Sequence, residues 1–125
     1  MKIAVIIVRV LMGLLFLFGS IVYFLKLYPQ PELSGNTKIF MDGVNAAGYL
    51  MPLIKITELL CGIAFVAGRF VPLATVVIAP IIVNIFLFHA FVDLTGLPVG
   101  IFLVLANSFL AYANWDKFKP LLVAK

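Results

Sequence analysis

The sequence predicts an all-α membrane protein: an antiparallel four-helix transmembrane bundle formed by a single domain, residues 1–125. First, 65% of the 125 residues are hydrophobic and only 11% are charged. A soluble domain this small keeps a large share of its surface exposed and could not hide so much apolar side chain. Second, the apolar residues fall in long runs with few charges, which is typical of integral membrane proteins. Third, short turns separate the later runs, and short turns force antiparallel neighbours.

Four runs are long enough to cross a bilayer, since a span needs ~20 mostly apolar residues at ~1.5 Å rise each. They cover residues 3–27, 49–67, 71–92 and 97–113. The first run follows Lys2, as the apolar core of a signal peptide would, but Arg9 interrupts it and no small-residue cleavage site follows. We therefore interpret it as a retained first span.

The turns between the later spans hold residues that end and start helices. Gly68 should end the second span and Pro72 should open the third, because Gly suits the position after a helix and Pro suits its first turn. Residues 93–96 form another short turn, with Pro98 at the start of the fourth span.

The long first loop and the distribution of charge set the expected topology. Residues 29–31 (Pro-Gln-Pro) and 34–36 (Ser-Gly-Asn) are incompatible with helix, and residues 37–42 could form a short helix lying at the membrane interface. Lys and Arg favour the cytoplasmic flanks of spans. Two basic residues, Lys26 and Lys38, flank the spans on the side of the long loop. Five flank them on the other side: Lys2, Arg69, Lys117, Lys119 and Lys125. Both termini are therefore expected in the cytoplasm.

Several function classes are disfavoured by composition. The net charge of +4 is spread over ends and loops, without the aromatic-interleaved basic patch expected of a nucleic-acid-binding protein. The single cysteine, Cys61, excludes an intramolecular disulfide and a CxxC pair, and we expect it to pack in the core. No metal site is expected, because one His, one Cys and scattered carboxylates give no ligand cluster. There is no phosphate-binding glycine loop and no nucleotide-binding fingerprint.

Glu58 is the most informative residue, because a charge at mid-bilayer costs ~2.5–3.5 kcal/mol. Three alternatives are open. Glu58 can pair with Arg9 across helices, or with Lys55 three residues earlier on the same helix face. It can instead be protonated and hydrogen-bond Asn84 or Asn107. It can also line a small cavity that binds a ligand or moves a proton.

We expect Arg9, Glu58 and Asn84 to lie close together inside the bundle, since an extended Arg side chain covers much of their difference in depth. Pro80 interrupts the third helix, and its kink should open space near the same depth. Interhelical hydrogen bonding is the default interpretation for Asn84 and for Asn107 in the fourth span. Lys55 could alternatively extend to the outer interface.

His89 lies near the outer end of the third span, four residues before Asp93. At that spacing the Asp could orient the imidazole. A lone His in this place is more often an interfacial hydrogen-bonding residue than a ligand.

The chain resembles the DoxX family of small bacterial four-helix membrane proteins. Residues 8–27 (VRVLMGLLFLFGSIVYFLKL), residues 49–91 and the short last span carry the resemblance over nearly the full length. In that family an Arg opens the first helix, a Gly-x-x-Lys-like segment closes it, and Glu-Leu, Gly and a Gly-Arg turn mark the second helix. The spacing from Gly to Lys is longer here than in the family. The matching positions are Arg9, Gly19, Lys26, Glu58, Leu59, Gly62, Gly68 and Arg69, with a loose match at Phe88 and His89.

The resemblance implies a protein of the bacterial inner membrane associated with redox chemistry of quinones, thiols or sulfur compounds. Family members resemble the membrane component of a thiosulfate:quinone oxidoreductase. Their four-helix relatives that form disulfides need cysteine pairs, which this chain lacks. We expect a membrane subunit or scaffold, in contact with the lipid bilayer, that docks a soluble oxidoreductase and holds a quinone or lipid. The alternatives are a stand-alone quinone- or lipid-binding oxidoreductase and a small transporter, and a homo-oligomer is compatible with each.

Overall fold

The computed structural model describes residues 2–26 and 33–124, and within these ranges all regular structure is helical. Four helices are long and apolar enough to cross a membrane. They are α1 (Lys2–Leu25), α3 (Leu50–Ala67), α4 (Val71–Phe91) and α5 (Leu97–Ala113), the last preceded by the 3-10 turn η1 (Leu94–Gly96). The chain is therefore a multi-pass membrane protein, and the predicted four-helix class is confirmed.

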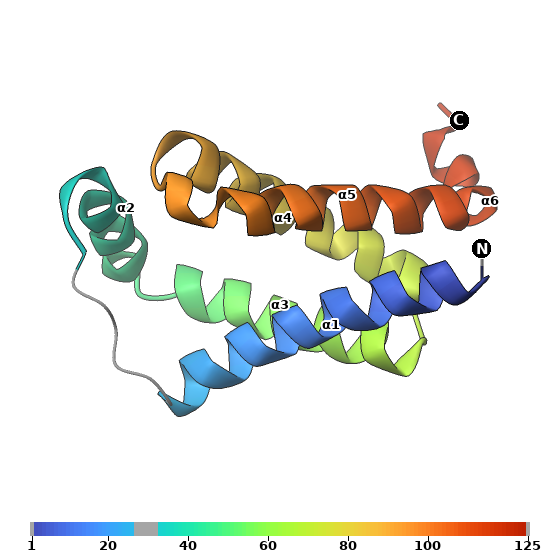
Figure 1. Ribbon diagram of the computed structural model, residues 1–125, viewed down its shortest axis with the longest axis horizontal. Helices are drawn as coiled ribbons and strands as arrows, with labels where there is room; N and C mark the ends of the chain where they lie inside the picture. The colour runs from blue at the N-terminus through green and yellow to red at the C-terminus, as the bar shows by residue number, and fades with distance from the viewer. Residues whose placement is uncertain (1, 27–32, 125) are drawn as a thin grey trace.

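The four spanning helices pack in a closed order, with α1 and α4 each lying against both α3 and α5. Figure 1 shows both chain ends at one end of the bundle, together with the short helix α6 (Trp115–Phe118). We call this the terminal end. The opposite end, which carries η1 and the helix α2 (Gly35–Ala46), we call the loop end.

The closest helix contact joins α1 to α3 and depends on two glycines. A Cβ placed on Gly62 would lie 3.0 Å from the Gly13 carbonyl oxygen, and one on Gly13 would lie 2.8 Å from Val66 Cγ2. Small residues allow such close approach of two backbones in membranes. Gly13 and Gly62 therefore serve helix packing.

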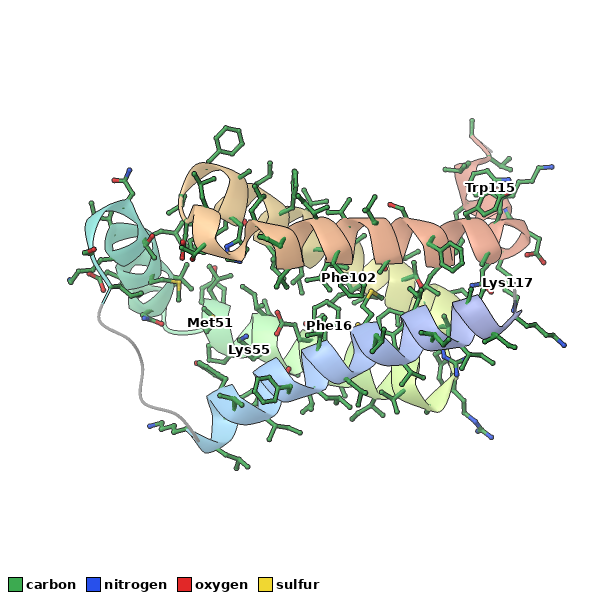
Figure 2. All side chains as sticks on the ribbon, in the orientation of Figure 1. Phe16, Met51, Lys55, Phe102, Trp115 and Lys117 are labelled. Carbon is green, nitrogen blue, oxygen red and sulfur yellow. The ribbon has the colours of Figure 1, made fainter. Side chains whose placement is uncertain are left out.

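Large apolar side chains fill the space between the helices, as Figure 2 shows for Phe16 and Phe102. The fully buried members of this core include Met12, Phe65, Ile78 and Leu110. The outward faces of the spanning helices are also apolar, which suits a surface solvated by lipid.

The helix in the long loop exceeds the predicted 37–42 at both ends, and the prediction that residues 34–36 are wholly non-helical is wrong. Ser34 is extended, with φ −143° and ψ 164°, and α2 begins at the next residue, Gly35. A Ser-Gly-Asn sequence thus marks a helix start here, with Ser34 at the N-cap position but without a capping hydrogen bond from its side chain. Half-buried residues recur along α2 at helical spacing, at Thr37, Phe40, Met41 and Val44.

Two span ends differ slightly from prediction. The helix α1 ends at Leu25, and Lys26 adopts a left-handed conformation with φ 52°. The helix α4 ends at Phe91, one residue early. The predicted end at residue 27, the segment 29–31 and Lys125 lie outside the described residues.

Candidate functional site

Lys55 and Glu58 form an ion pair inside α3. Lys55 Nζ donates to Glu58 Oε2 at 3.2 Å. Glu58 is only 5% exposed, whereas the Lys55 side chain is 22% exposed. Residues three apart face the same side of a helix, and the side chains of a helix lean toward its N-terminus. Both groups therefore incline toward the loop end, and Lys55 is the one that remains reachable.

Lys55 also lines a half-open cavity of about 910 Å³ at the loop end, bordered by the last turns of α1, by α2 and by the start of α3. We call it the loop-end cavity. Figure 2 shows Lys55 and Met51 at this end of α3. Val22 and Phe24 contribute apolar wall, and Tyr23 and Asn45 contribute polar groups. The site thus combines an apolar wall with the Lys55 ammonium group, whose counter-charge is buried behind it.

The backbone of α1 passes beside the Lys55 ammonium group at Gly19. A Cβ on Gly19 would lie 3.8 Å from Lys55 Nζ, so the backbone of α1 passes directly beside the charge with no side chain between them. Lys26, at the end of the same helix, lines the cavity as well. Gly19 and Lys26, two of the residues that carry the family resemblance, therefore both line this cavity.

Arg9 does not join Glu58, and the expected cluster of Arg9, Glu58 and Asn84 is wrong. The Arg9 guanidinium lies against Gly68, where a Cβ would be 2.8 Å from Nη1. The directions of the helices explain the separation. Arg9 leans toward the N-terminus of α1, at the terminal end, while Glu58 leans toward the N-terminus of α3, at the loop end.

Asn84 lies on the outer surface of α4, exposed, and the structure gives its side chain no hydrogen bond to a described residue. Its predicted place in a buried polar cluster is wrong. Pro80 is exposed on the same helix, and no residue of α4 lines the loop-end cavity. The loop-end cavity lies between α1, α2 and α3 and does not result from a kink at Pro80.

Asn107 is buried and links α5 to α4. Its Nδ2 donates to the Thr75 carbonyl oxygen at 3.3 Å, while Oδ1 is buried and has no donor among the described residues. The Thr75 hydroxyl donates to the Val71 carbonyl oxygen at 2.7 Å. Asn107 is therefore a packing residue, as the default interpretation held, and it is not a partner of Glu58. Cys61 is buried in the same core.

His89 is oriented by Asp93, but through the backbone. His89 Nδ1 donates to the Asp93 carbonyl oxygen at 3.0 Å. The Asp93 carboxylate instead accepts from the Thr95 hydroxyl at 2.6 Å and the Thr95 N–H at 3.1 Å. These hydrogen bonds from Thr95 lower the pKa of Asp93 below its ordinary value. His89 also covers Gly96, where a Cβ would overlap the imidazole ring, so both residues serve the η1 turn.

Sequence reasoning missed the contribution of α2 to the site. The residues of α2 that line the loop-end cavity are Met41 and Asn45. The helical spacing of Thr37, Phe40, Met41 and Val44 indicates that α2 presents one face to the bundle. Within residues 2–26 and 33–124, no three His, Cys, Asp or Glu side chains form a group that could hold a metal ion.

Comparison of the chain with models of protein families, with curated proteins and with solved structures found no match.

Proposed function

We propose that this protein is a membrane subunit of a redox system that binds a lipid-soluble molecule with an oxygen-bearing head group in the loop-end cavity. The observation that supports the proposal is the meeting of an apolar wall with the Lys55 ammonium group in a cavity of about 910 Å³. Small-molecule sites in proteins are commonly mostly apolar clefts of ~300–1,000 Å³ with a few placed polar groups.

Beside Lys55, the ion pair with Glu58 favours a neutral acceptor such as a quinone over an anion. Lys55 has three N–H donors, of which one is used by Glu58. The remaining donors suit a carbonyl oxygen, and Glu58 already balances the charge of Lys55. A quinone ring offers such an acceptor, and its apolar tail suits Val22, Phe24 and Met51. A phospholipid shares this chemistry through its ester oxygens and is the competing source.

The redox association rests on the resemblance to the DoxX family, and its partner would be a soluble oxidoreductase. In this proposal the chain binds and positions the ligand, and the partner supplies the electron transfer. The excess of Lys and Arg at the terminal end supports cytoplasmic termini in a bacterial inner membrane. The loop-end cavity then lies in the outer half of the bilayer.

The test is a titration of the purified protein in mild detergent with a short-chain benzoquinone, followed by thermal unfolding. A ligand that binds the folded state stabilises it by about 2.7 kcal/mol at a hundredfold excess over Kd, so the unfolding midpoint of the wild type should rise. Lys55→Met should lose this response. Met51→Trp, which narrows the cavity with a bulkier side chain and leaves the ion pair intact, should weaken it.

Lys38→Met is the matched control, since Lys38 lies at the same end of the bundle, pairs with Asp42 at 2.8 Å and does not line the cavity. Its response should equal that of the wild type. An equal midpoint rise in all four proteins would contradict the proposal. A rise with added phospholipid but none with the quinone would assign the cavity to a lipid.

A further inference from the structure

At the terminal end of the bundle, the Arg9 side chain has a buried hydrogen-bond donor without an acceptor among the described residues. It is half-buried in α1, its guanidinium lies on Gly68, and its Nε is buried with no hydrogen-bond partner among the described residues. Gly68 has φ 74°, a left-handed conformation that suits glycine, and the absence of a Cβ there makes room for the guanidinium. Buried donors are nearly always satisfied, so an unpaired one beside a cavity indicates a missing acceptor.

Such a cavity is present. A pocket of about 240 Å³ opens at this point, and Arg9, Val71, Asn114 and Lys117 contribute to its lining. We call it the terminal-end pocket. Its residues come from α1, from the turn between α3 and α4, and from the end of α5 with α6. Figure 2 shows Lys117 at this end, beside the start of α1.

The electrostatics of the pocket favour an anion. Arg9 and Lys117 bring two positive charges, and α4 begins at Val71, where the first N–H groups of a helix lack partners and carry partial positive charge. The nearest acidic residue in sequence, Asp116, is exposed. The ion pairs of the described residues are Lys38–Asp42 and Lys55–Glu58, so neither Arg9 nor Lys117 is neutralised.

We propose that the terminal-end pocket binds the phosphate group of an anionic phospholipid. Arginine presents a planar fork of donors that matches phosphate oxygens, and basic pockets between spanning helices are known sites for lipid head groups. Arg9 lies seven residues into α1, about 10 Å from its start, so its side chain reaches back to the depth of the head groups. Phe70 and Leu73, 74% and 61% exposed, offer apolar surface for the acyl chains beside the pocket.

The test uses the full chain in mild detergent and measures binding of phosphatidylglycerol by native mass spectrometry, with phosphatidylcholine as the neutral comparison. A hydrogen bond to a charged group contributes ~1.5–3 kcal/mol, so Arg9→Gln and Lys117→Gln should each weaken phosphatidylglycerol binding by about tenfold or more. Lys119→Gln removes the same charge two residues further on, outside the pocket, and should stay within about twofold of the wild type.

Lys117 is exposed, so Lys117→Gln keeps the test valid even if Arg9→Gln fails to fold. A matching loss in all three variants would indicate general attraction of anions to a basic surface and would overturn the proposal. Equal binding of phosphatidylglycerol and phosphatidylcholine by the wild type would overturn it as well.

A competition experiment decides whether the bound phosphate group belongs to a phospholipid or to a soluble anion. Inorganic phosphate and glycerol phosphate are added at millimolar concentration as competitors. A lipid site should keep its phosphatidylglycerol, because the acyl chains add affinity that the free anions lack. Displacement by inorganic phosphate alone would contradict the lipid source and assign the pocket to a soluble anion. Variants of Lys55 should leave this binding unchanged, so the result is independent of the proposed quinone site.

A different observation carries a second inference. Asn84 lies on a face of α4 formed otherwise by exposed apolar residues, among them Val83 and Leu87. A hydroxyl such as that of Ser108, exposed on α5, can bond a carbonyl of its own helix. An amide can place one N–H in the same way, as Asn114 Nδ2 does to the Leu110 carbonyl oxygen at 2.9 Å, but its oxygen needs a donor from outside the helix. We propose that this face of α4 binds the same face of a second copy, because two Asn84 amides satisfy each other across a twofold axis.

Association is measured by energy transfer between labelled copies in lipid vesicles at increasing dilution. Asn84→Leu should raise the dissociation constant by about threefold or more, Asn84→Gln should restore association, and Ser108→Ala should leave it unchanged. Equal association of Asn84→Leu and wild type, or a monomeric wild type at every dilution, would overturn this inference.

Discussion

Lys55 and Glu58 differ in how well each would tolerate the loss of its partner. Glu58 is 5% exposed and lies eight residues into α3, about 12 Å from the start of that helix. Lys55 is nearer the loop end and lines the cavity, so an unpaired ammonium can reach water there. An unpaired Glu58 carboxylate has no comparable route.

We therefore predict an asymmetric response. Lys55→Met should lower the free energy of unfolding by about 3–5 kcal/mol, the usual result of leaving one buried charge unpaired. Glu58→Gln should cost clearly less, and the double variant Lys55→Met/Glu58→Leu should cost less than the sum of the single changes. Unfolding in mixed micelles measures all three. A larger loss in Glu58→Gln than in Lys55→Met would contradict the placement of the pair.

Asn107 should contribute little to stability despite its burial. It makes one interhelical hydrogen bond and leaves Oδ1 unpaired, and such bonds in membranes average about 0.6 kcal/mol. Asn107→Leu should therefore change the free energy of unfolding by no more than about 1 kcal/mol. A loss of several kcal/mol in the same assay would mean that Oδ1 has a partner in the folded protein, such as a bound water.

At the scale of helices, the contact of α1 with α3 depends on Gly62. A Cβ there would lie 3.0 Å from the Gly13 carbonyl oxygen, so Gly62→Ala must push two backbones apart. Overpacking of this kind typically costs about 1–3 kcal/mol. Gly43→Ala in α2, where nothing lies within 4 Å of the added Cβ, should be neutral or slightly stabilising. Equal effects of the two substitutions would contradict the close crossing.

The η1 turn should lose stability in acid. The hydrogen bonds from Thr95 lower the pKa of Asp93 in the folded state. The stabilisation is then fully present above the unfolded pKa of about 3.9 and is lost as the pH falls through the lower folded value. The stability difference between wild type and Asp93→Asn should be constant near neutral pH and shrink below about pH 4. A difference that grows on acidification would contradict the assignment.

The sequence predicted the spanning helices closely but not which way each faces. The bounds agree within two residues because lipid requires long apolar runs, and the Lys55–Glu58 pair followed from helical spacing. Asn84 was misplaced because α4 is apolar on every side, so no pattern indicates its buried face. Arg9 was misplaced because depth alone was compared, without the direction in which a helical side chain leans. The loop-end cavity depends on the docking of α2. The spacing of its half-buried residues indicates which face it presents, but no local pattern specifies where on the bundle it docks.

For the molecule as a whole, the basic side chains of the spanning helices and their flanks separate toward the two ends of an apolar bundle. Arg9 and Lys117 face the terminal-end pocket, and Lys26 and Lys55 face the loop-end cavity. Phe16 and Phe65 are among the side chains buried in the core of the bundle. This separation favours two binding regions in different leaflets over one polar path across the membrane, and it therefore argues against the transporter alternative.

The loop-end cavity as the ligand site is tested most directly by photolabelling the protein in membranes with a photoreactive benzoquinone and mapping the modified peptides. We predict labels concentrated in the segments that enclose the cavity, residues 19–26, 41–45 and 51–55, and their loss when unlabelled short-chain quinone is present in excess. Labels spread over α4 and α5, or labels that the unlabelled quinone does not displace, would contradict this account.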